Sequence, residues 1–427
     1  MTLKIDRRKG VEPKMLDNFS MVKPTIYHLD NGIPVYEVSG GSQEVVRIEV
    51  VIDAGSYYQS VAGQAMLMTR MMVEGTQKYS GKDISDITEF YGSFISNSPE
   101  KDFVSFSVTA LNKHLEKLLP VLEEVICCPT FPDAERQKLI NAQKHDLAVD
   151  RQKVQTRSFF EFQELIYGKK CPYRSITKEI EFDLLTPELI KDFYETQVGP
   201  KAVKIFVAGL PEKNLSTLLN KHLGGKWGAS KLKTQDNFIV DSAKAGRHDI
   251  VIPGAIQSGI MLGYPIISRN HPDYHFLEIT NMVFGGYFNS RLMSNIREDK
   301  GYTYGIHSHF VSVLHTSFFY ISTEVNSQFT EPTLNEIYKE IDILRQDKIS
   351  VEELNQVRTN LLGGFIRSLD GPLLQGGKVR TMVDYQLGED YYQKYLDAIL
   401  SVTPDDILNT AQKYFGNEKF IEVVVRG

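Results

Sequence analysis

Residues 63–76, with the sequence GQAMLMTRMMVEGT, decide how the rest of the chain is interpreted. Their apolar residues recur at helical spacing and predict an amphipathic core helix over residues 61–74. Met66 and Arg70 are four residues apart, so their side chains share one face of that helix, with Thr69 just before Arg70. A core helix alone would explain these residues, so the surrounding sequence has to decide whether they also mark a functional site.

The frame around these residues resembles the zinc-site helix of the insulinase/pitrilysin family of peptidases, the inverzincins, and especially its mitochondrial-processing-peptidase-like branch. That helix carries the motif H-x-x-E-H. Its two histidines bind one zinc ion, and its glutamate is the general base on the metal-bound water. In this chain Met66 and Arg70 stand at the histidine positions, and Thr69 stands at the glutamate position.

None of the three replacements can perform that chemistry. The thioether of Met66 is a soft, weak ligand for zinc, and Arg70 is a permanent cation that offers no lone pair. Thr69 is not a base at neutral pH. The resemblance also implies a glutamate ligand on a later helix, which matches residues 135–146, and Ala142 falls about where that glutamate is expected. We therefore expect a peptidase scaffold that binds no metal.

Composition excludes several classes of protein. The 427 residues suggest two or more domains, and 42% hydrophobic and 24% charged residues are ordinary for a globular protein. The net charge of −6 argues against nucleic acid or acidic lipid as partners. No apolar run reaches membrane-spanning length, so we expect no membrane partner.

The N-terminus and the cysteines indicate a cytoplasmic protein. Residues 1–10 are basic but have no apolar segment behind them, which does not fit a secretory signal. Cys127, Cys128 and Cys171 lack the spacing of a disulfide framework and predict reduced, buried thiols.

Two distant segments share one pattern. Thr-Pro at residues 186–187 begins a predicted helix that leads to a strand at 203–209, and Thr-Pro at 403–404 begins another that leads to 421–427. In both segments threonine caps the helix, proline occupies its first turn and β-branched residues form the strand. The segments lie about half a chain apart, which indicates an internal duplication.

The elements upstream repeat in the same order. Each half is expected to contain a strand, two helices, two strands, a third helix and long helical stretches. The first set is predicted at residues 45–53, 61–74, 82–91, 93–97, 102–110, 112–127 and 132–168, and the second at 258–263, 272–284, 289–299, 302–310, 316–325, 331–346 and 351–390.

This order predicts an α+β protein with two duplicated domains, each a mainly antiparallel sheet covered by helices on one face. The family resemblance, which runs from about residue 20 to the end, implies the same fold. Residues 1–223 form the expected N-terminal domain with the degenerate motif, and residues 247–427 the C-terminal domain. The predicted linker, 224–246, contains Gly224, Gly225, Gly228, Lys231, Lys233, Ser242 and Gly246.

A second resemblance lies in residues 290–304, SRLMSNIREDKGYTY. They resemble the family's helix–turn–strand segment, where an arginine at the helix end is followed seven residues later by a tyrosine; Arg297 and Tyr304 match. The resemblance implies that this pair faces the zinc across a chamber. The tyrosine hydroxyl donates to the developing oxyanion and the arginine holds substrate carbonyls. Such preorganised donors contribute about a hundredfold or more in rate each.

The local sequence supports this placement. Gly301 is expected to end the helix in a left-handed conformation. A helix C-terminus also favours an arginine through its dipole, so an ordinary arginine and an ordinary strand tyrosine are the alternative. The apolar face expected beside Arg297 consists of Phe288, Leu292, Met293 and Ile296.

Other near-motifs are interpreted as structural. His271, His275 and Glu278 make a metal site chemically conceivable, but we expect solvated or capping histidines there. His307, His309 and His315 are expected on adjacent strands as surface or chamber-wall residues. Glycines at 370–372 and 376–378 lack phosphate-loop spacing and predict a turn between helices.

The sequence thus predicts a non-catalytic, substrate-binding subunit of a heterodimeric zinc peptidase. Its partner would be a homologous chain with an intact H-x-x-E-H motif, which would hold the zinc, and the ligand would be a peptide substrate. This chain would bind no cofactor and would supply Arg297 and Tyr304 in trans. The alternatives are a catalytically dead structural or binding protein of the same fold, and a metal enzyme built on the other histidine groups.

Overall fold

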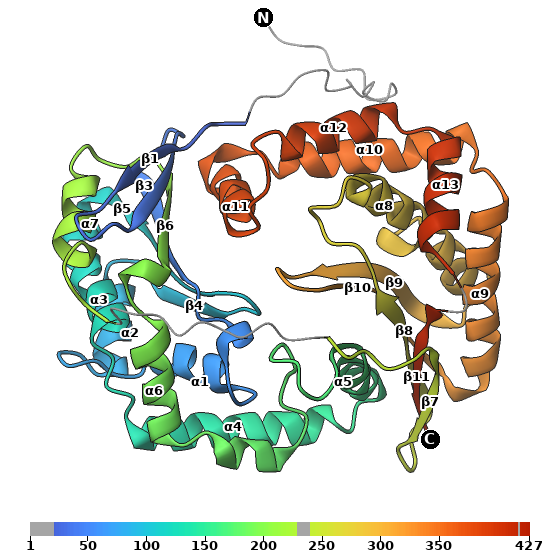
Figure 1. The fold of residues 1–427 in the computed structure, drawn as a ribbon, viewed down its shortest axis with the longest axis horizontal. Coiled ribbons are helices and arrows are strands. Elements are labelled where there is room, and N and C mark those ends of the chain that lie inside the picture. Colours follow the sequence, from blue (N-terminus) through green and yellow to red (C-terminus); the bar gives the residue numbers. More distant parts are fainter. Residues whose placement is uncertain (1–20, 229–239, 417–418) are drawn as a thin grey trace, which may run out of the picture.

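The protein is described by a computed structural model that covers residues 21–228, 240–416 and 419–427. Two halves, each a sheet with its own helices, face each other across the molecule (Figure 1). The interpretation of residues 1–10, and Lys231 and Lys233 of the predicted linker, lie outside the described residues.

The first half is built on a six-stranded sheet with the order β1-β2-β6-β3-β5-β4. Apolar residues of α1, α3 and α6 pack on one face of this sheet and form its main core. The elements are β1 (Thr25–His28), β2 (Pro34–Ser39), β3 (Val45–Ile52), α1 (Gln64–Met71), α2 (Gly81–Phe90), β4 (Ile95–Pro99), β5 (Val104–Leu111), α3 (Leu115–Cys127), α4 (Asp133–Asp150), α5 (Val154–Tyr167), α6 (Pro187–Gln197), β6 (Val203–Gly209) and α7 (Leu215–Leu223).

The second half is built on a five-stranded sheet with the order β7-β11-β8-β10-β9. A second core fills the space between this sheet and its helices. The elements are β7 (Gly246–Val251), β8 (Gln257–Pro265), α8 (Tyr274–Asn281), the π-helical turns η5 (Met282–Gly286) and η6 (Met293–Asp299), β9 (Thr303–Ser312), β10 (Ser317–Asn326), α9 (Thr330–Gln346), α10 (Val351–Arg367), α11 (Gly371–Asp384), α12 (Tyr391–Ser401), α13 (Pro404–Tyr414) and β11 (Ile421–Arg426).

The two sheets confirm the predicted duplication. When β2, β6, β3, β5 and β4 are matched with β7, β11, β8, β10 and β9, the strand orders are identical, and β1 is an additional edge strand. Most pairs are antiparallel, as predicted, but β2–β6 and β7–β11 are parallel. The sequence analysis missed β1, β2 and β7.

Each half uses a helix from the other half to cover the second face of its sheet. Helix α5 packs on β8 and β11, and its Phe162 contacts Phe318 of the neighbouring strand β10 with ring centroids 5.8 Å apart. Helix α11 packs on β6 and β2 through Val379. Helices therefore lie on both faces of each sheet rather than on one.

Two predictions about local structure are wrong. Residues 376–378 do not form a turn but lie inside α11. Helix α11 approaches β6 so closely that a Cβ added to Gly376 would lie 2.6 Å from the Cβ of Ala208. All three cysteines are free, but only Cys171 is buried; Cys127 and Cys128 are half-buried.

Arg380 joins α11 to the first half. Its guanidinium contacts Glu49 at 2.9 Å, Glu100 at 2.7 Å and Asp384 at 3.0 Å. Glu49 and Asp384 are buried, so removing Arg380 would leave two buried carboxylates with less compensating positive charge.

The hairpin turns of the two halves also meet. Asp102, between β4 and β5, accepts the backbone N–H of Leu314, between β9 and β10, at 2.9 Å, and it also accepts the hydroxyl of Tyr173. The ring of His315 stacks on Tyr57 with centroids 4.0 Å apart. Burial raises the pKa of Asp102 above its ordinary value. The joint therefore combines a polar contact with ring stacking.

In the described part of the chain, no helix is both long enough and apolar enough to span a bilayer.

Adjacent glycines of α11 test the contact with β6. Gly376 is buried against Ala208, whereas Gly377 is exposed and a Cβ there would meet nothing within 4 Å. We expect Gly376→Ala to lower the free energy of unfolding by about 1–3 kcal/mol through overpacking. Gly377→Ala should leave it unchanged or raise it by up to about 1 kcal/mol through helix propensity. Urea unfolding measures both; equal effects of the two substitutions would contradict this packing.

Candidate functional site

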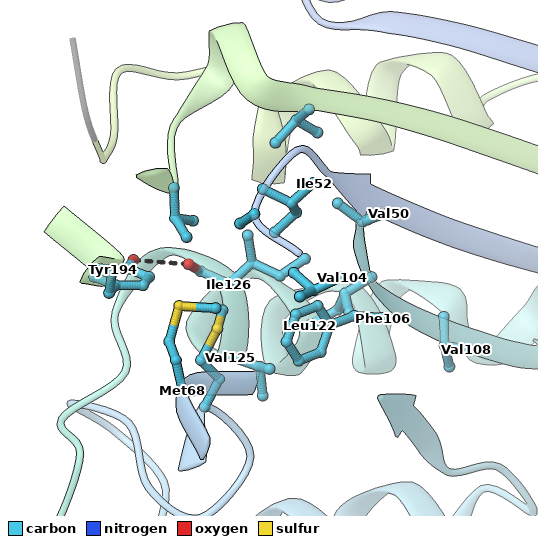
Figure 2. Close-up of a cluster of buried hydrophobic side chains, with 14 of the residues drawn as sticks. Val50, Ile52, Met68, Val104, Phe106, Val108, Leu122, Val125, Ile126 and Tyr194 are labelled. Carbon is cyan, nitrogen blue, oxygen red and sulfur yellow. Dashed lines mark hydrogen bonds between the residues drawn. The ribbon is translucent and has the colours of Figure 1, made fainter. Parts of the chain in front are cut away.

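Helix α1 is fixed by its apolar face. Leu67 and Met68 are fully buried, and Figure 2 shows Met68 beside Val125 in the first core. The helix begins at Gly63, whose φ of +85° favours glycine; a Cβ there would lie 2.4 Å from Cδ1 of Ile176. These contacts set the positions of the three degenerate motif residues without involving any of them.

The three motif positions lie in different surroundings. Met66 is half-buried and lines a cavity of about 430 Å³. Thr69 is completely buried, and its hydroxyl donates to the backbone carbonyl of Ala65 at 2.7 Å. Arg70 is half-buried in the last turn of α1. The Thr69 hydroxyl, at the position where the sequence resemblance expects a general base, is thus held by its own helix.

Helix α4 borders the same cavity from the other side. Ala142 is exposed and is not among the lining residues, whereas Gln143, Asp146, Leu147 and Asp150 line the cavity together with Met66. These four residues are therefore the ones of α4 that share a space with Met66. The sequence analysis did not single them out, because one sequence could not set the register of α4 against α1.

A half-buried lysine also lines this cavity. Lys101, in the turn after β4, donates to the backbone carbonyl of Tyr173 at 2.5 Å. Burial lowers the pKa of Lys101 to about 8. No sequence pattern distinguishes Lys101 from an ordinary turn lysine, so only the fold identifies it.

The residues present do not fit zinc. A thioether, a threonine hydroxyl that is hydrogen-bonded within its helix and a guanidinium occupy the three motif positions. Lys101 adds an amine to the cavity that Met66 lines. Among the described residues, no group of three or more His, Cys, Asp or Glu side chains is arranged to hold a metal ion.

Arg297 projects from the π-helical turn η6. Its guanidinium carbon lies 4.5 Å from the ring centroid of Phe288, and its nearest carboxylate, on Glu298, is 3.8 Å away. Leu292 and Ile296 are buried as predicted, but Phe288 is 58% exposed. The prediction that Phe288 belongs to the apolar face is therefore wrong: its ring supports the guanidinium instead.

Tyr304 is presented by a β-bulge at the start of β9. Gly301, with φ of +66°, ends the preceding turn as predicted, and the backbone N–H of Tyr302 donates to Ile296 at 3.0 Å. The bulge sets residues 304–305 opposite Glu324 alone. This irregularity turns Tyr304 away from the core side, and the tyrosine is 100% exposed.

The structure places the two sets of predicted residues in different halves. Met66, Thr69 and Arg70 belong to the helix layer of the first sheet, and Tyr304 lies on β9, the edge strand of the second sheet. The chain thus carries the degenerate motif and the Arg297/Tyr304 pair as separate features.

The other histidines do not form the alternative metal site. Nδ1 of His271 accepts the backbone N–H of Asp273 at 3.1 Å, and Nδ1 of His275 lies 3.5 Å from Glu278. His307 and His309 are exposed on one face of β9, with ring centroids 6.0 Å apart. His315 is separate from them, stacked on Tyr57.

Two family models match the chain. Residues 37–165 match the model described as "Insulinase (Peptidase family M16)", and residues 184–361 match the model described as "Peptidase M16 inactive domain".

Curated relatives are similar at low identity. The "Uncharacterized zinc protease YmxG" of Bacillus subtilis is 21% identical over 81% of this chain and 84% of its own length. The "Probable inactive metalloprotease YmfF" of the same organism is 22% identical, over 81% and 85%. The human "Mitochondrial-processing peptidase subunit alpha" is 21% identical, over 90% and 78%.

A solved structure supports the fold. A peptidase M16 inactive domain from Pseudomonas fluorescens superposes with a TM-score of 0.85 and 22% identity, covering 94% of this chain and 98% of that one. This likeness confirms the predicted fold of paired sheets and helices.

Metal analysis tests the degenerate motif. We expect purified protein to carry well under one equivalent of zinc after dialysis, because Met66 and Arg70 offer no suitable ligand. Plasma mass spectrometry measures the ratio, and a homologue with an intact H-x-x-E-H motif, purified in parallel, is the control. A full equivalent that is lost in Met66→Ala would contradict the assignment.

We expect the free energy of unfolding to depend on pH because of the lowered pKa of Lys101. The pKa of Lys101 in the folded protein, about 8, lies below the ordinary value of 10.5, so the unfolded chain binds more protons in that interval. The free energy of unfolding should rise with pH between these values, relative to that of Lys101→Met. Urea unfolding of both proteins at about pH 7 and about pH 10 measures this difference. A constant difference would show that the lysine is not desolvated.

Proposed function

Because the chain belongs to the insulinase-type M16 peptidase family, we propose that it is the non-catalytic, substrate-binding subunit of a heterodimeric zinc peptidase. The match to the inactive-domain model and the likeness to a probable inactive metalloprotease support a non-catalytic member of the family. The division of labour between two chains is our proposal.

One observation carries the proposal. Met66, Thr69 and Arg70 are not suited to metal-dependent hydrolysis, whereas Arg297 and Tyr304 are placed where a substrate or a partner can reach them. Thr69 is buried and bonded within its helix, so it cannot activate a water molecule. Tyr304 is fully exposed, although burying a tyrosine ring is normally favourable. A tyrosine turned outward by a bulge has a better explanation in a substrate or a partner than in packing within this chain.

In this proposal the pair acts in trans. The hydroxyl of Tyr304 would donate a hydrogen bond to the oxyanion that develops on the scissile carbonyl. Arg297, steadied by the ring of Phe288, would hold backbone carbonyls of the peptide. Both groups are donors, so neither needs to change protonation state during the reaction.

The proposed partner is a homologous chain with an intact H-x-x-E-H motif, and the zinc would be bound by that partner. One relative is by name the α subunit of a mitochondrial processing peptidase, and therefore one part of a larger peptidase. We also propose that the protein is cytoplasmic and binds neither nucleic acid nor membranes.

Co-expression with a homologous H-x-x-E-H chain tests the role of the pair. The complex should cleave peptides, and Arg297→Ala or Tyr304→Phe should lower kcat by about a hundredfold while the complex still elutes as a heterodimer. Tyr302→Phe is the matched control, because the Tyr302 ring stacks on Phe329 with centroids 4.6 Å apart and should not take part.

The same experiment separates the alternative function. If the complex forms and cleaves peptides equally well with Ala at position 297 and Phe at position 304, the pair has no catalytic role. The chain would then be a structural or binding protein of this fold.

A further inference from the structure

A cavity of about 700 Å³ lies outside both features described above. It opens between the loop before α8, the loop after α11, and helix α12, and its volume falls in the range of small-molecule sites. The lining residues that matter here are Arg269, Phe276, Asp390, Tyr391, Lys394 and Asp397.

The cation that lines this cavity beside an aromatic ring is Arg269. The face of its guanidinium lies over the ring of Tyr385, 4.1 Å from the centroid. Its Nε is buried and has no hydrogen-bond partner, and within the described part of the chain it forms no ion pair. In contrast, Arg291 binds Glu353 through two nitrogen atoms at 2.8 and 2.9 Å. A stacked guanidinium keeps its N–H edge available for a planar anion.

The other charges of the cavity limit the ligand. Lys394 is already paired with Asp390 at 2.8 Å. Asp397 accepts the side-chain amide of Gln393 at 2.8 Å. Two carboxylates at the rim disfavour a multiply charged anion, so a single carboxylate fits better than a phosphate.

Aromatic rings form the wall of the cavity. The ring of Tyr391 lies 4.6 Å from the ring of His275, and Phe276 is half-buried at the same wall. Burial raises the pKa of Tyr391, so its phenol stays neutral and its ring presents an uncharged face. A planar ring can pack against such a wall in the geometry that aromatic pairs prefer.

We propose that this cavity binds a small monocarboxylate that carries an aromatic ring, with Arg269 holding the carboxylate and Tyr391 packing on the ring. Two sources share this chemistry: a free aromatic acid, and the C-terminal residue of a peptide that ends in phenylalanine. The site is independent of the proposed peptidase role.

Calorimetric titration of the full chain tests the site. The probes are 3-phenylpropionate, its neutral isostere 3-phenylpropionamide, and acetyl-Ala-Ala-Phe with a free C-terminus. We expect 3-phenylpropionate to bind saturably with one site per chain and the amide to bind at least about tenfold more weakly, because it lacks the charge. If the peptide binds more tightly than 3-phenylpropionate, the ligand is a peptide terminus; if it binds more weakly, the ligand is a free acid.

Variants locate the binding. Arg269→Gln should weaken 3-phenylpropionate binding by about tenfold or more, and Arg269→Lys, which keeps the charge, should weaken it less. Arg367→Gln is the matched control and should change the affinity by less than about threefold, since Arg367 is exposed at the end of α10 and does not line the cavity. Thermal midpoints show whether each variant is folded, and the amide comparison needs no variant.

Two results would overturn the proposal. One is the absence of saturable 3-phenylpropionate binding below about 10 mM. The other is equal affinity for the acid and the amide in the wild type. Neither measurement uses peptidase activity, so neither result bears on the proposed function, which is tested by the co-expression experiment.

Discussion

The exchange of helices between the halves is the constraint on which the rest of the structure depends. A sheet with only one covered face would expose an apolar surface, and here α5 and α11 each cover the second face of the opposite sheet. Arg380 makes the exchange specific, because its guanidinium meets carboxylates of both halves. The halves therefore hold a defined relative position, which in turn fixes where β9 and its bulge point.

In helix α1, the residues that pack in the core are different from the residues at the three motif positions. Helix α1 is held by Leu67 and Met68, which face the core. The positions that would bear histidines face outward or toward a cavity, so their identity can change without loss of the fold. This explains how a chain can keep the scaffold of a metallopeptidase with a thioether at Met66 and a guanidinium at Arg70.

Periodicity and capping predicted most of the elements. The two Thr-Pro helices and the strands after them stand where predicted, because their signals are local. The parallel strand β7 was missed, because its pairing with β11 joins residues far apart in the sequence. Residues 376–378 of α11 were mistaken for a turn, because Gly376 reflects the close approach of the helix to Ala208, a tertiary contact that no local signal contains.

In the candidate site, too, some residues could be predicted from the sequence and others are identified only by the fold. Arg297 and Tyr304 were found through the resemblance of residues 290–304 to the family's helix–turn–strand segment. The exposure of Tyr304, however, depends on a bulge opposite Glu324, and the ring that packs on Arg297, that of Phe288, was expected on the apolar face. No sequence pattern singles out Lys101 or Arg269. Only the fold desolvates the amine of Lys101, and only the fold leaves Nε of Arg269 buried without a hydrogen-bond partner.

We propose that this chain does not hydrolyse peptides by itself, because Met66, Thr69 and Arg70 offer neither a suitable zinc ligand nor a general base. The most direct test is to incubate the purified chain with a mixture of fluorogenic peptides and added zinc, with and without a chelator. We predict no chelator-sensitive cleavage. Zinc-dependent cleavage that persists through successive purification steps and is abolished by the chelator would contradict the account.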